Sequence, residues 1–402
     1  MAEFKNIKSK LNLRDIKSLY IIKTIFSFLN KKQKLHIIIY NKKLQKLLLI
    51  DIEDYKKISW RYKIGKKNGK GKEIIIDTDY LIYEGEYLNG RRNGKGKEYY
   101  RNGKLKFEGE YLNGKKWNGN GYDINGNIEF EIKDGKGSIK EYDYYDGRLE
   151  FEGEYLNGEK NGKGKEYNFD GNLKFEGEYI NGIKNGKGKE YFQNSNLKFE
   201  GEYLNGKKWN GSGYDINGNM EFYIKDGKGN IKEFDYCGKL LFEGEYLNGK
   251  RNGKGKEYNF YSNLSFEGEY LNEKRNGKGK EYYRNGKLKF EGEYLNGKKW
   301  NGNGYDINGN MKFEIKDGKG NIKEYDYFDG RIEFEGEYLN GERSGKGKEY
   351  GECNLLSFEG EYSKGRKNGK GKEYDQCGFL RFEGEYLDGE RNGKGKLYFY
   401  KY

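Results

Sequence analysis

Few side chains in this sequence have the types and spacing that catalysis needs. Histidine is the usual acid, base and metal ligand near neutral pH, yet His36 is the only one in the chain and lies next to apolar residues. The carboxylates of Asp143 and Asp146 fall in one predicted loop, and two neighbouring acids are too weak a pattern for a cation site. We therefore predict no catalytic residue, no metal site, no cofactor and no enzymatic activity.

Two other patterns could suggest phosphate or nucleic acid as a ligand. The repeated Gly-Lys-Gly-Lys stretches do not read Gly-x4-Gly-Lys-Ser/Thr and none opens a predicted helix, so they are not phosphate-binding loops. Aromatic residues interleaved with lysine could stack on single-stranded nucleic acid. However, residues 1–60 hold 14 Lys and Arg against 5 Asp and Glu, which is +9 of the net +13 and leaves only +4 for the rest. Nucleic acid binding needs a sustained positive face, so we expect no nucleic acid partner.

The three cysteines are Cys237, Cys353 and Cys377, and each stands seven residues before the Gly of a Gly-Glu-Tyr triplet. Equivalent turns of neighbouring hairpins lie roughly 9–10 Å apart, beyond the ~7 Å Cα limit of a disulfide. We therefore predict free thiols. No secretory signal is found, and no apolar run reaches the roughly 18 residues of a membrane span, so the expected compartment is the cytoplasm.

A fixed period organises the chain beyond residue 57. The composition, with 33% hydrophobic and 36% charged residues, would also suit a disordered chain, but 40 Tyr and 23 Phe provide large rings to bury. A spacing of 24, interrupted by gaps of 43 or 44, separates most Gly-Glu-Tyr triplets, and such a period indicates a repeat protein. The triplets begin at Gly85, Gly109, Gly153, Gly177, Gly201, Gly244, Gly268, Gly292, Gly336, Gly360 and Gly384. The long gaps hold degenerate units at 130–137, 222–229 and 313–320, and another unit starts the array at 58–71, which gives about fifteen units.

Each unit reads as a β-hairpin. Alternation puts Tyr83, Gly85 and Tyr87 on one face of a strand and Glu84 and Glu86 on the other. Asn-Gly pairs then supply the positive φ angles of tight turns. Successive hairpins predict an all-β fold, an elongated single-layer antiparallel solenoid over residues 58–402.

Three units depart from the pattern. Trp117, Trp209 and Trp300 recur at intervals of 92 and 91 residues and suggest one inserted residue before the second glycine pair of their units. We interpret them as filling space beside the shortened unit that follows, with a row of exposed indoles as the alternative. Glu273 stands where other units have a glycine.

The repeat resembles the MORN repeat. Tyr83, Gly85, Gly90, Gly94 and Gly96 match its pattern at offsets 0, 2, 7, 11 and 13, and the same register recurs through the chain. The resemblance implies roles in protein association, in cytoskeletal organisation or in tethering near membranes, and phospholipid binding.

Residues 1–57 form a different, basic segment in which apolar residues at helical spacing predict short amphipathic helices. The stretch 18–29 followed by 34–48 also resembles an F-box, although the usual Leu-Pro entry is absent because the chain has no proline. That resemblance implies docking to a Skp1-like adaptor through Leu19, Ile22, Ile25, Phe26 and Leu29. The alternatives are a cap on the first strand of the array and an anchor on anionic lipid. The anchor would use Lys31, Lys32, Lys34, Lys42, Lys43 and Lys46.

These patterns favour a non-enzymatic scaffold whose groove binds a helix or a peptide of a protein partner. The alternatives are a ubiquitin-ligase substrate receptor and a peripheral binder of anionic membranes, and the chain would be cytoplasmic or associated with membrane or cytoskeleton. A homodimer formed through residues 397–402 stays open. The tyrosines expected to line the groove are Tyr87, Tyr111, Tyr155, Tyr179, Tyr203, Tyr246, Tyr270, Tyr294, Tyr338, Tyr362 and Tyr386.

Overall fold

The computed structural model describes residues 61–75, 80–351 and 354–399, and every regular element in them is a β-strand. The prediction of an all-β array of antiparallel hairpins is confirmed for these residues. The predicted N-terminal helices, with their adaptor-binding and lipid-binding residues, lie outside the described residues, as does the proposed dimer contact from residue 400 onward. The described residues include no helix long and apolar enough to cross a membrane.

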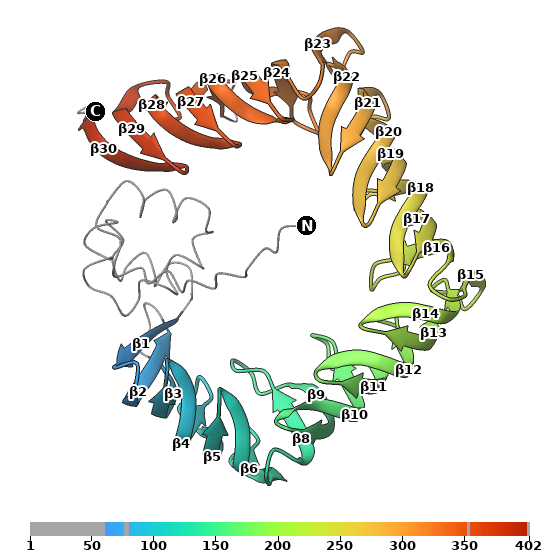
Figure 1. Cartoon of the computed structure of the whole chain (residues 1–402), viewed down its shortest axis with the longest axis vertical. Coiled ribbons are helices and arrows are strands. Elements are labelled where there is room, and N and C mark those ends of the chain that lie inside the picture. Colours follow the sequence, from blue (N-terminus) through green and yellow to red (C-terminus); the bar gives the residue numbers. More distant parts are fainter. Residues whose placement is uncertain (1–60, 76–79, 352–353, 400–402) are drawn as a thin grey trace, which may run out of the picture. The chain divides into compact units, whose positions relative to one another are not determined.

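The chain divides into two compact units, residues 1–164 and 165–402. In the first unit, seven strands form one sheet in chain order and an eighth and ninth strand form the start of the next (Figure 1). The first sheet consists of β1 (Arg61–Gly65), β2 (Gly69–Ile75), β3 (Leu81–Leu88), β4 (Arg91–Tyr99), β5 (Leu105–Leu112), β6 (Lys115–Tyr122) and β7 (Ile128–Ile132). It is followed by β8 (Gly137–Tyr142) and β9 (Leu149–Leu156), and β10 (Glu159–Tyr167) contains the boundary between the units.

The second unit holds strands of three sheets, and within each sheet every strand pairs with the next one along the chain. The strands β11 (Leu173–Ile180), β12 (Ile183–Tyr191), β13 (Leu197–Leu204), β14 (Lys207–Tyr214) and β15 (Met220–Ile224) come first. The next sheet holds β16 (Gly229–Phe234), β17 (Leu240–Leu247), β18 (Lys250–Tyr258), β19 (Leu264–Leu271), β20 (Lys274–Tyr282), β21 (Leu288–Leu295), β22 (Lys298–Tyr305) and β23 (Met311–Ile315). The last holds β24 (Gly320–Tyr325), β25 (Ile332–Leu339), β26 (Glu342–Tyr350), β27 (Leu356–Ser363), β28 (Arg366–Tyr374), β29 (Leu380–Leu387) and β30 (Glu390–Leu397).

The turns have the backbone that their sequences predict. Asn89 and Gly90 connect β3 to β4 with φ angles of 52° and 80°, which is the combination that a two-residue hairpin turn requires. Glu273 occupies the second turn position in one hairpin and keeps a φ of 74°, a conformation that glycine adopts with less strain. Its carboxylate accepts a hydrogen bond of 3.2 Å from the backbone N–H of Arg251, which compensates for part of that strain.

A row of glycines crosses each sheet at its centre. Gly244 pairs with Gly255, Gly255 with Gly268, and Gly268 with Gly279. A Cβ atom on Gly268 would lie 2.6 Å from the Cα atom of Gly279, so the two backbones are too close for any side chain between them. The glycine row is therefore a packing requirement of the sheet.

The degenerate units mark the ends of the sheets. Between β15 and β16, for example, a single bridge joins Lys225 to Lys228 around the turn Asp226–Gly227. In β16 the glycine position is taken by Ile231, which is buried and pairs with Gly244. The same arrangement ends the sheets after β7 and β23.

The tryptophan units correct one detail of the sequence interpretation. In a regular unit three residues separate Arg92 from Gly96, the glycine that pairs with Gly85. In the tryptophan unit only two, Trp117 and Asn118, separate the equivalent lysine from the glycine that pairs with the first strand. The prediction of an inserted residue was therefore wrong, because these units have a shorter bulge.

The tryptophans fill space, as predicted. A Cβ atom on Gly135 would lie 2.7 Å from the ring of Trp117, and the backbone N–H of Gly135 donates to the carbonyl of Trp117 at 2.8 Å. Trp209 and Gly227 repeat both contacts. These indoles are half-buried against the short hairpin that ends each sheet.

The described cysteines are free thiols, as predicted. Cys237 and Cys377 are exposed at turns, and neither forms a disulfide. The thiol of Cys237 lies 3.4 Å from the side-chain oxygen of Gln193. Cys353 lies outside the described residues.

Candidate binding groove

The tyrosines predicted to line a groove belong to the core of the array. Tyr87, Tyr111, Tyr179, Tyr203, Tyr270, Tyr294, Tyr362 and Tyr386 have exposed fractions of 2–4%. Tyr155, Tyr246 and Tyr338 are partly buried against the same core. In one hairpin pair the ring of Phe266 meets Tyr270 and Tyr294 edge to face, with centroids 5.7 and 5.3 Å apart. A partner could not reach these rings without displacing the core, so an accessible groove must lie elsewhere.

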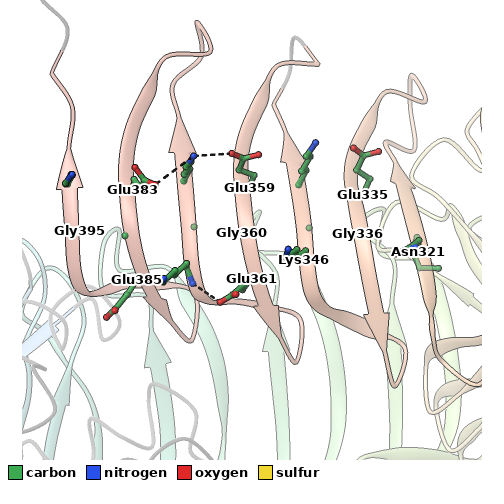
Figure 2. A pocket seen from close by; sticks show the side chains of 18 of the residues that line it. Asn321, Glu335, Gly336, Lys346, Glu359, Gly360, Glu361, Glu383, Glu385 and Gly395 are labelled. Carbon is green, nitrogen blue, oxygen red and sulfur yellow. Dashed lines mark hydrogen bonds and ion pairs between the residues drawn. The ribbon is translucent and has the colours of Figure 1, made fainter.

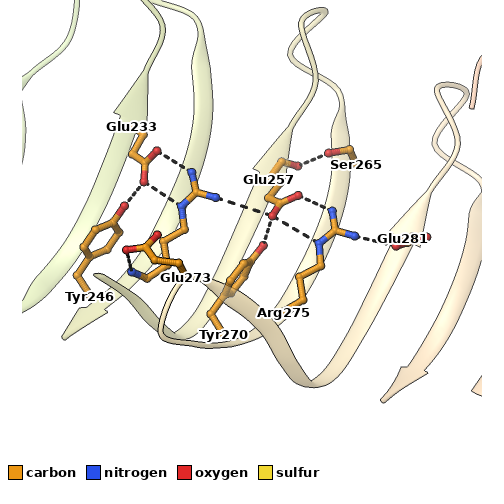
Figure 3. Close-up of polar contacts among 9 residues, drawn as sticks. Glu233, Tyr246, Glu257, Ser265, Tyr270, Glu273, Arg275 and Glu281 are labelled. Carbon is orange, nitrogen blue, oxygen red and sulfur yellow. Dashed lines mark hydrogen bonds and ion pairs between the residues drawn. The ribbon is translucent and has the colours of Figure 1, made fainter. Parts of the chain in front are cut away.

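What closes the aromatic face is a ladder of arginine and glutamate that the sequence interpretation missed. Arg275 lies over the ring of Phe266, with its guanidinium carbon 4.0 Å from the ring centroid. It donates to Glu257 at 2.5 Å and to Glu281 at 2.7 Å (Figure 3). Glu257 also accepts a hydrogen bond of 2.7 Å from the hydroxyl of Tyr270. The pair with Glu257 on β18 therefore bridges two hairpins, and the pair with Glu281 lies along β20 itself, above a buried ring where the alkyl stem packs and the charge is neutralised.

The same arrangement recurs in other regular units, where lysine takes the place of arginine at Lys160, Lys184 and Lys367. Arg92 joins Glu73 to Glu98, and Arg343 joins Glu324 to Glu349. In the tryptophan units lysine replaces the arginine, as in the ion pair of 2.8 Å between Lys299 and Glu281.

Acid should weaken these ladders. Burial alone would raise the pKa of Glu281, but the positive charges of Lys299 and Arg275 outweigh it and lower that pKa from 4.5 to about 2. Burial alone would likewise raise the pKa of Glu98, but the positive charges of Lys116 and Arg92 outweigh it and lower that pKa to about 2. A carboxylate with a lowered pKa in the folded state stabilises the fold above its unfolded pKa, and that contribution is lost as the pH falls through the folded value.

We therefore expect the contribution of these carboxylates to the free energy of unfolding to be constant above about pH 5. It should fall steeply between about pH 4.5 and pH 2. Thermal unfolding followed by circular dichroism at successive pH values measures this. The variant Glu281→Gln should show a smaller loss over that window because it removes one of the titrating groups. A stability profile that is flat down to pH 2 in the parent chain would contradict the ladder's role.

A second set of buried charges supports the sheet ends. The ammonium groups of Lys106, Lys198 and Lys289 donate to backbone carbonyls at 2.5, 2.7 and 2.6 Å, and each acceptor lies 36 residues further on. Burial lowers the pKa of each of these lysines. Each contact ties a tryptophan hairpin to the first strand of the next sheet. In the sequence, each of these lysines directly precedes the Phe-Glu-Gly of a tryptophan unit. This pattern could not have identified the contact, because Lys174 also precedes Phe-Glu-Gly but lies in a regular unit.

The opposite face of the sheet carries the open grooves. In sheet β24–β30 a groove of about 1020 Å³ runs across the strands above the glycine row (Figure 2). Two more grooves, of about 630 and 830 Å³, lie on the equivalent face of the sheets that begin at β16 and β1. The groove of sheet β24–β30 has a floor of Gly336, Gly347, Gly360, Gly371, Gly384 and Gly395, with Ile322 and Asn321 at one end. Lysine and glutamate side chains flank that floor on both sides.

One wall of this groove, the upper row, alternates lysine and glutamate. Its members are Lys323, Glu335, Lys348, Glu359, Lys372, Glu383 and Lys396, one from each strand. Lys323 lies 3.5 Å from Glu335, and Lys372 lies 3.9 Å from both Glu359 and Glu383. Tyrosine hydroxyls hold two of the glutamates, because Tyr350 donates to Glu335 at 2.7 Å and Tyr374 donates to Glu359 at 2.8 Å. Most charges of the upper row are therefore neutralised within the sheet.

The other wall, the lower row, consists of Lys346, Glu361, Lys370, Glu385 and Lys394. Here Glu361 turns away from Lys346, the residue it pairs with across the strands, and accepts the backbone N–H of Lys370 at 2.9 Å (Figure 2). Among the residues that the structure describes, no carboxylate lies within ion-pair distance of the ammonium groups of Lys346, Lys370 or Lys394. These three exposed lysines stand on alternate strands, β26, β28 and β30.

The described residues contain no group of three or more His, Cys, Asp or Glu arranged to hold a metal ion. What the groove face offers instead is backbone at the glycine floor, aliphatic stems and charged heads. This is a surface for binding an elongated chain.

The fold and its two faces define the class of the molecule, which is a β-hairpin repeat protein with an aromatic core on one side of a single-layer sheet. Some of its units are similar to the MORN repeat. The model of that family matches eight positions: residues 83–104, 151–173, 175–197, 242–259, 266–287, 334–352, 358–376 and 382–402. The three tryptophan units are not among the matches, which agrees with their shorter bulge. That the remaining units are also MORN repeats stays a prediction.

Solved structures with detectable similarity are distant. The crystal structure of TarM is 12% identical, with 48% of this chain and 32% of that chain covered and a TM-score of 0.16. The Tc holotoxin pore of Photorhabdus luminescens is 10% identical, with 77% and 18% covered and a TM-score of 0.15. A catalytically inactive virginiamycin B lyase from Staphylococcus aureus with quinupristin is 11% identical, with 80% and 96% covered and a TM-score of 0.18.

The chain spans about a third or less of the TarM and toxin chains. These likenesses carry no argument about its function. No curated protein matches the sequence.

Proposed function

We propose that this protein is a non-enzymatic scaffold that binds an elongated segment of a protein partner in the glycine-floored grooves of its MORN repeat array. The observation that carries the proposal is the groove of about 1020 Å³ across β24–β30. MORN repeats are commonly modules for interaction with proteins or membranes. A groove that runs across seven strands suits a chain molecule better than a compact ligand.

Three features of the site support binding without catalysis. The aromatic face is filled by its own rings and ladder, which leaves the lysine and glutamate face for contact. The strand backbone at the glycine row lines the floor of the groove, where a partner's chain can approach it. The flanking side chains of the groove present charges that can select a partner by its own charge pattern.

Photo-crosslinking in cells tests the proposal. A benzoylphenylalanine residue placed at position 348, an exposed lysine of the groove, should crosslink to a defined protein partner, which is identified by mass spectrometry. The matched control carries the same residue at Lys287, which is exposed at a turn outside the grooves. The same partners from both positions, or none from position 348, would contradict groove binding.

The basic segment 1–57 keeps its separate hypotheses of a cap, an adaptor-binding F-box-like element and a lipid anchor. Pull-downs with the full chain and with residues 58–402 distinguish them, and capture of a Skp1-like adaptor by the full chain alone would favour the ligase receptor. Vesicles of anionic lipid that retain only the full chain, and release it with salt, would favour the anchor.

A further inference from the structure

The lower row of the C-terminal groove has a spacing that can be compared with known chain conformations. Lys346, Lys370 and Lys394 occupy alternate strands of one sheet. Adjacent strands lie about 4.7–4.9 Å apart, so the backbone positions of these lysines repeat at about 9.4–9.8 Å along the groove. A partner that pairs with all three must present acidic groups on one side at this interval.

The glutamates of the lower row do not neutralise these lysines. Glu361 accepts the backbone N–H of Lys370 at 2.9 Å, and Glu269 in the preceding sheet accepts the N–H of Lys278 at 3.1 Å. The upper row differs, because Lys323 and Lys372 have carboxylates at 3.5 and 3.9 Å. Two of the four upper lysines, Lys323 and Lys372, are therefore paired, whereas the three lower lysines, on alternate strands, have no ion pair among the described residues.

Chain conformations differ in how well they match the interval. A polyproline II helix has three residues per turn and rises about 3.1 Å per residue, so every third side chain lies on one side at about 9.3 Å. An α-helix returns to the same side after seven residues, at about 10.5 Å, and slips by about 1 Å at each step. A β-strand repeats on one side at about 6.6–6.8 Å and does not match.

The width of the groove favours the same conformation. The two rows flank the glycine row at one residue to either side, so they stand about 7 Å apart along the strands. An α-helix with side chains is about 10–12 Å wide and would rest on top of the rows. A single extended chain can lie between them, against the glycine floor.

We propose that the groove of β24–β30 binds an extended, polyproline II-like segment of a protein partner that carries an acidic residue at every third position. This rests on the proposed function and names the chemistry of the partner. The carboxylates of the segment would face Lys346, Lys370 and Lys394, and its backbone would lie along the glycine row. The equivalent lysines of the preceding sheet, Lys254 and Lys278, offer a shorter copy of the same row.

The test uses the full chain and a fluorescent peptide of about four Glu-Pro-Pro triplets, which adopts polyproline II, with binding followed by fluorescence anisotropy. We expect saturable binding that weakens with salt. A Gln-Pro-Pro peptide of the same length should bind at least about tenfold more weakly, as should an alanine-rich helical peptide with Glu at every seventh position. Equal binding of the Glu and Gln peptides, or tighter binding of the helix, overturns the proposal.

Two triple variants locate the site, because both remove three positive charges from the same face of the same sheet. Lys346→Gln, Lys370→Gln and Lys394→Gln together should weaken binding by about tenfold or more. The matched set Lys323→Gln, Lys348→Gln and Lys372→Gln should change it by less than about threefold. Circular dichroism verifies that both variants fold. Equal losses from the two sets would show a non-specific charge effect and overturn the proposal.

The outcome is separable from that of the proposed function. Crosslinking of a partner from position 348 without binding of the Glu-Pro-Pro peptide would overturn only the acidic, extended partner. Failure of crosslinking would remove the groove-binding function as well.

Discussion

The variant Arg275→Met is expected to lose about 3 kcal/mol of stability in the hairpins β18–β21, because it removes the cation that joins two buried carboxylates. Arg275 contacts Glu257 at 2.5 Å and Glu281 at 2.7 Å, and its stem covers the ring of Phe266. Methionine keeps much of the aliphatic part of the side chain over Phe266, but Glu257 loses its ion pair with the guanidinium group. The side chains of Arg275 and Glu257 are 26% and 23% exposed, so we place the loss at the low end of values for buried pairs.

The measurement is native-state hydrogen exchange, because each repeat of such an array contacts mainly its neighbours and unfolding need not be two-state. Protection should fall in β18–β21 and stay unchanged in β27–β29. Arg366→Met is the matched control, since Arg366 is exposed and has no ion pair in the described part of the chain. Adding Glu257→Leu to Arg275→Met should restore part of the loss, because it removes the orphaned charge. A loss no larger than that of Arg366→Met would show that the ladder contributes little.

Much of the fold follows from local sequence. Alternation in Tyr83-Glu-Gly85-Glu-Tyr87 and the Asn89-Gly90 turn predict a hairpin with the correct strands and faces, and the structure confirms both. These features depend on neighbouring residues alone. The period of the triplets then orders the hairpins along the chain.

The location of the groove could not be predicted in the same way. Alternation says that Tyr87 and Glu86 lie on opposite faces, but it does not say which face is covered. The cover comes from Arg92, whose partner Glu98 lies further along the same strand, β4, and whose partner Glu73 lies on β2, beyond β3. Their approach depends on the cross-strand register, and that register depends on the length of the bulge before Gly96. Periodicity does not encode that length.

The tryptophan units show the same limit. Counted along the sequence, Gly119 and Gly121 resemble a displaced copy of Gly94 and Gly96. In the structure Gly119 pairs with Gly109, as Gly96 pairs with Gly85. Only the paired backbone distinguishes a shorter bulge from an insertion.

The glycine row should tolerate substitution least of all. Gly360→Ala is expected to destabilise the hairpins around β27 by about 2–3 kcal/mol, at the upper end of what overpacking costs. Its Cβ atom would lie 2.6 Å from the carbonyl oxygen of Lys370 and 2.7 Å from both the Cα atom of Gly371 and the ring of Phe358. Two of these three atoms belong to the backbone of β28, which cannot move without breaking its pairing with β27. Hydrogen exchange of the β26–β29 amides and the midpoint of thermal unfolding measure the effect.

Gly351→Ala, directly after β26, is the matched control, because among the described residues its Cβ atom would meet only the carbonyl oxygen of Leu355, at 3.8 Å, and its φ is not in the left-handed region. That substitution should change stability by less than about 0.5 kcal/mol. If Gly360→Ala lowered the stability as little as Gly351→Ala, the paired strands could move apart to accommodate a Cβ atom. Close packing of the two backbones would then not be the reason for the glycine row. A large and local loss would instead mean that the floor of the groove is the tightest part of the array. The partner would then meet a rigid surface, and selection among partners would rest with the lysine and glutamate rows on either side.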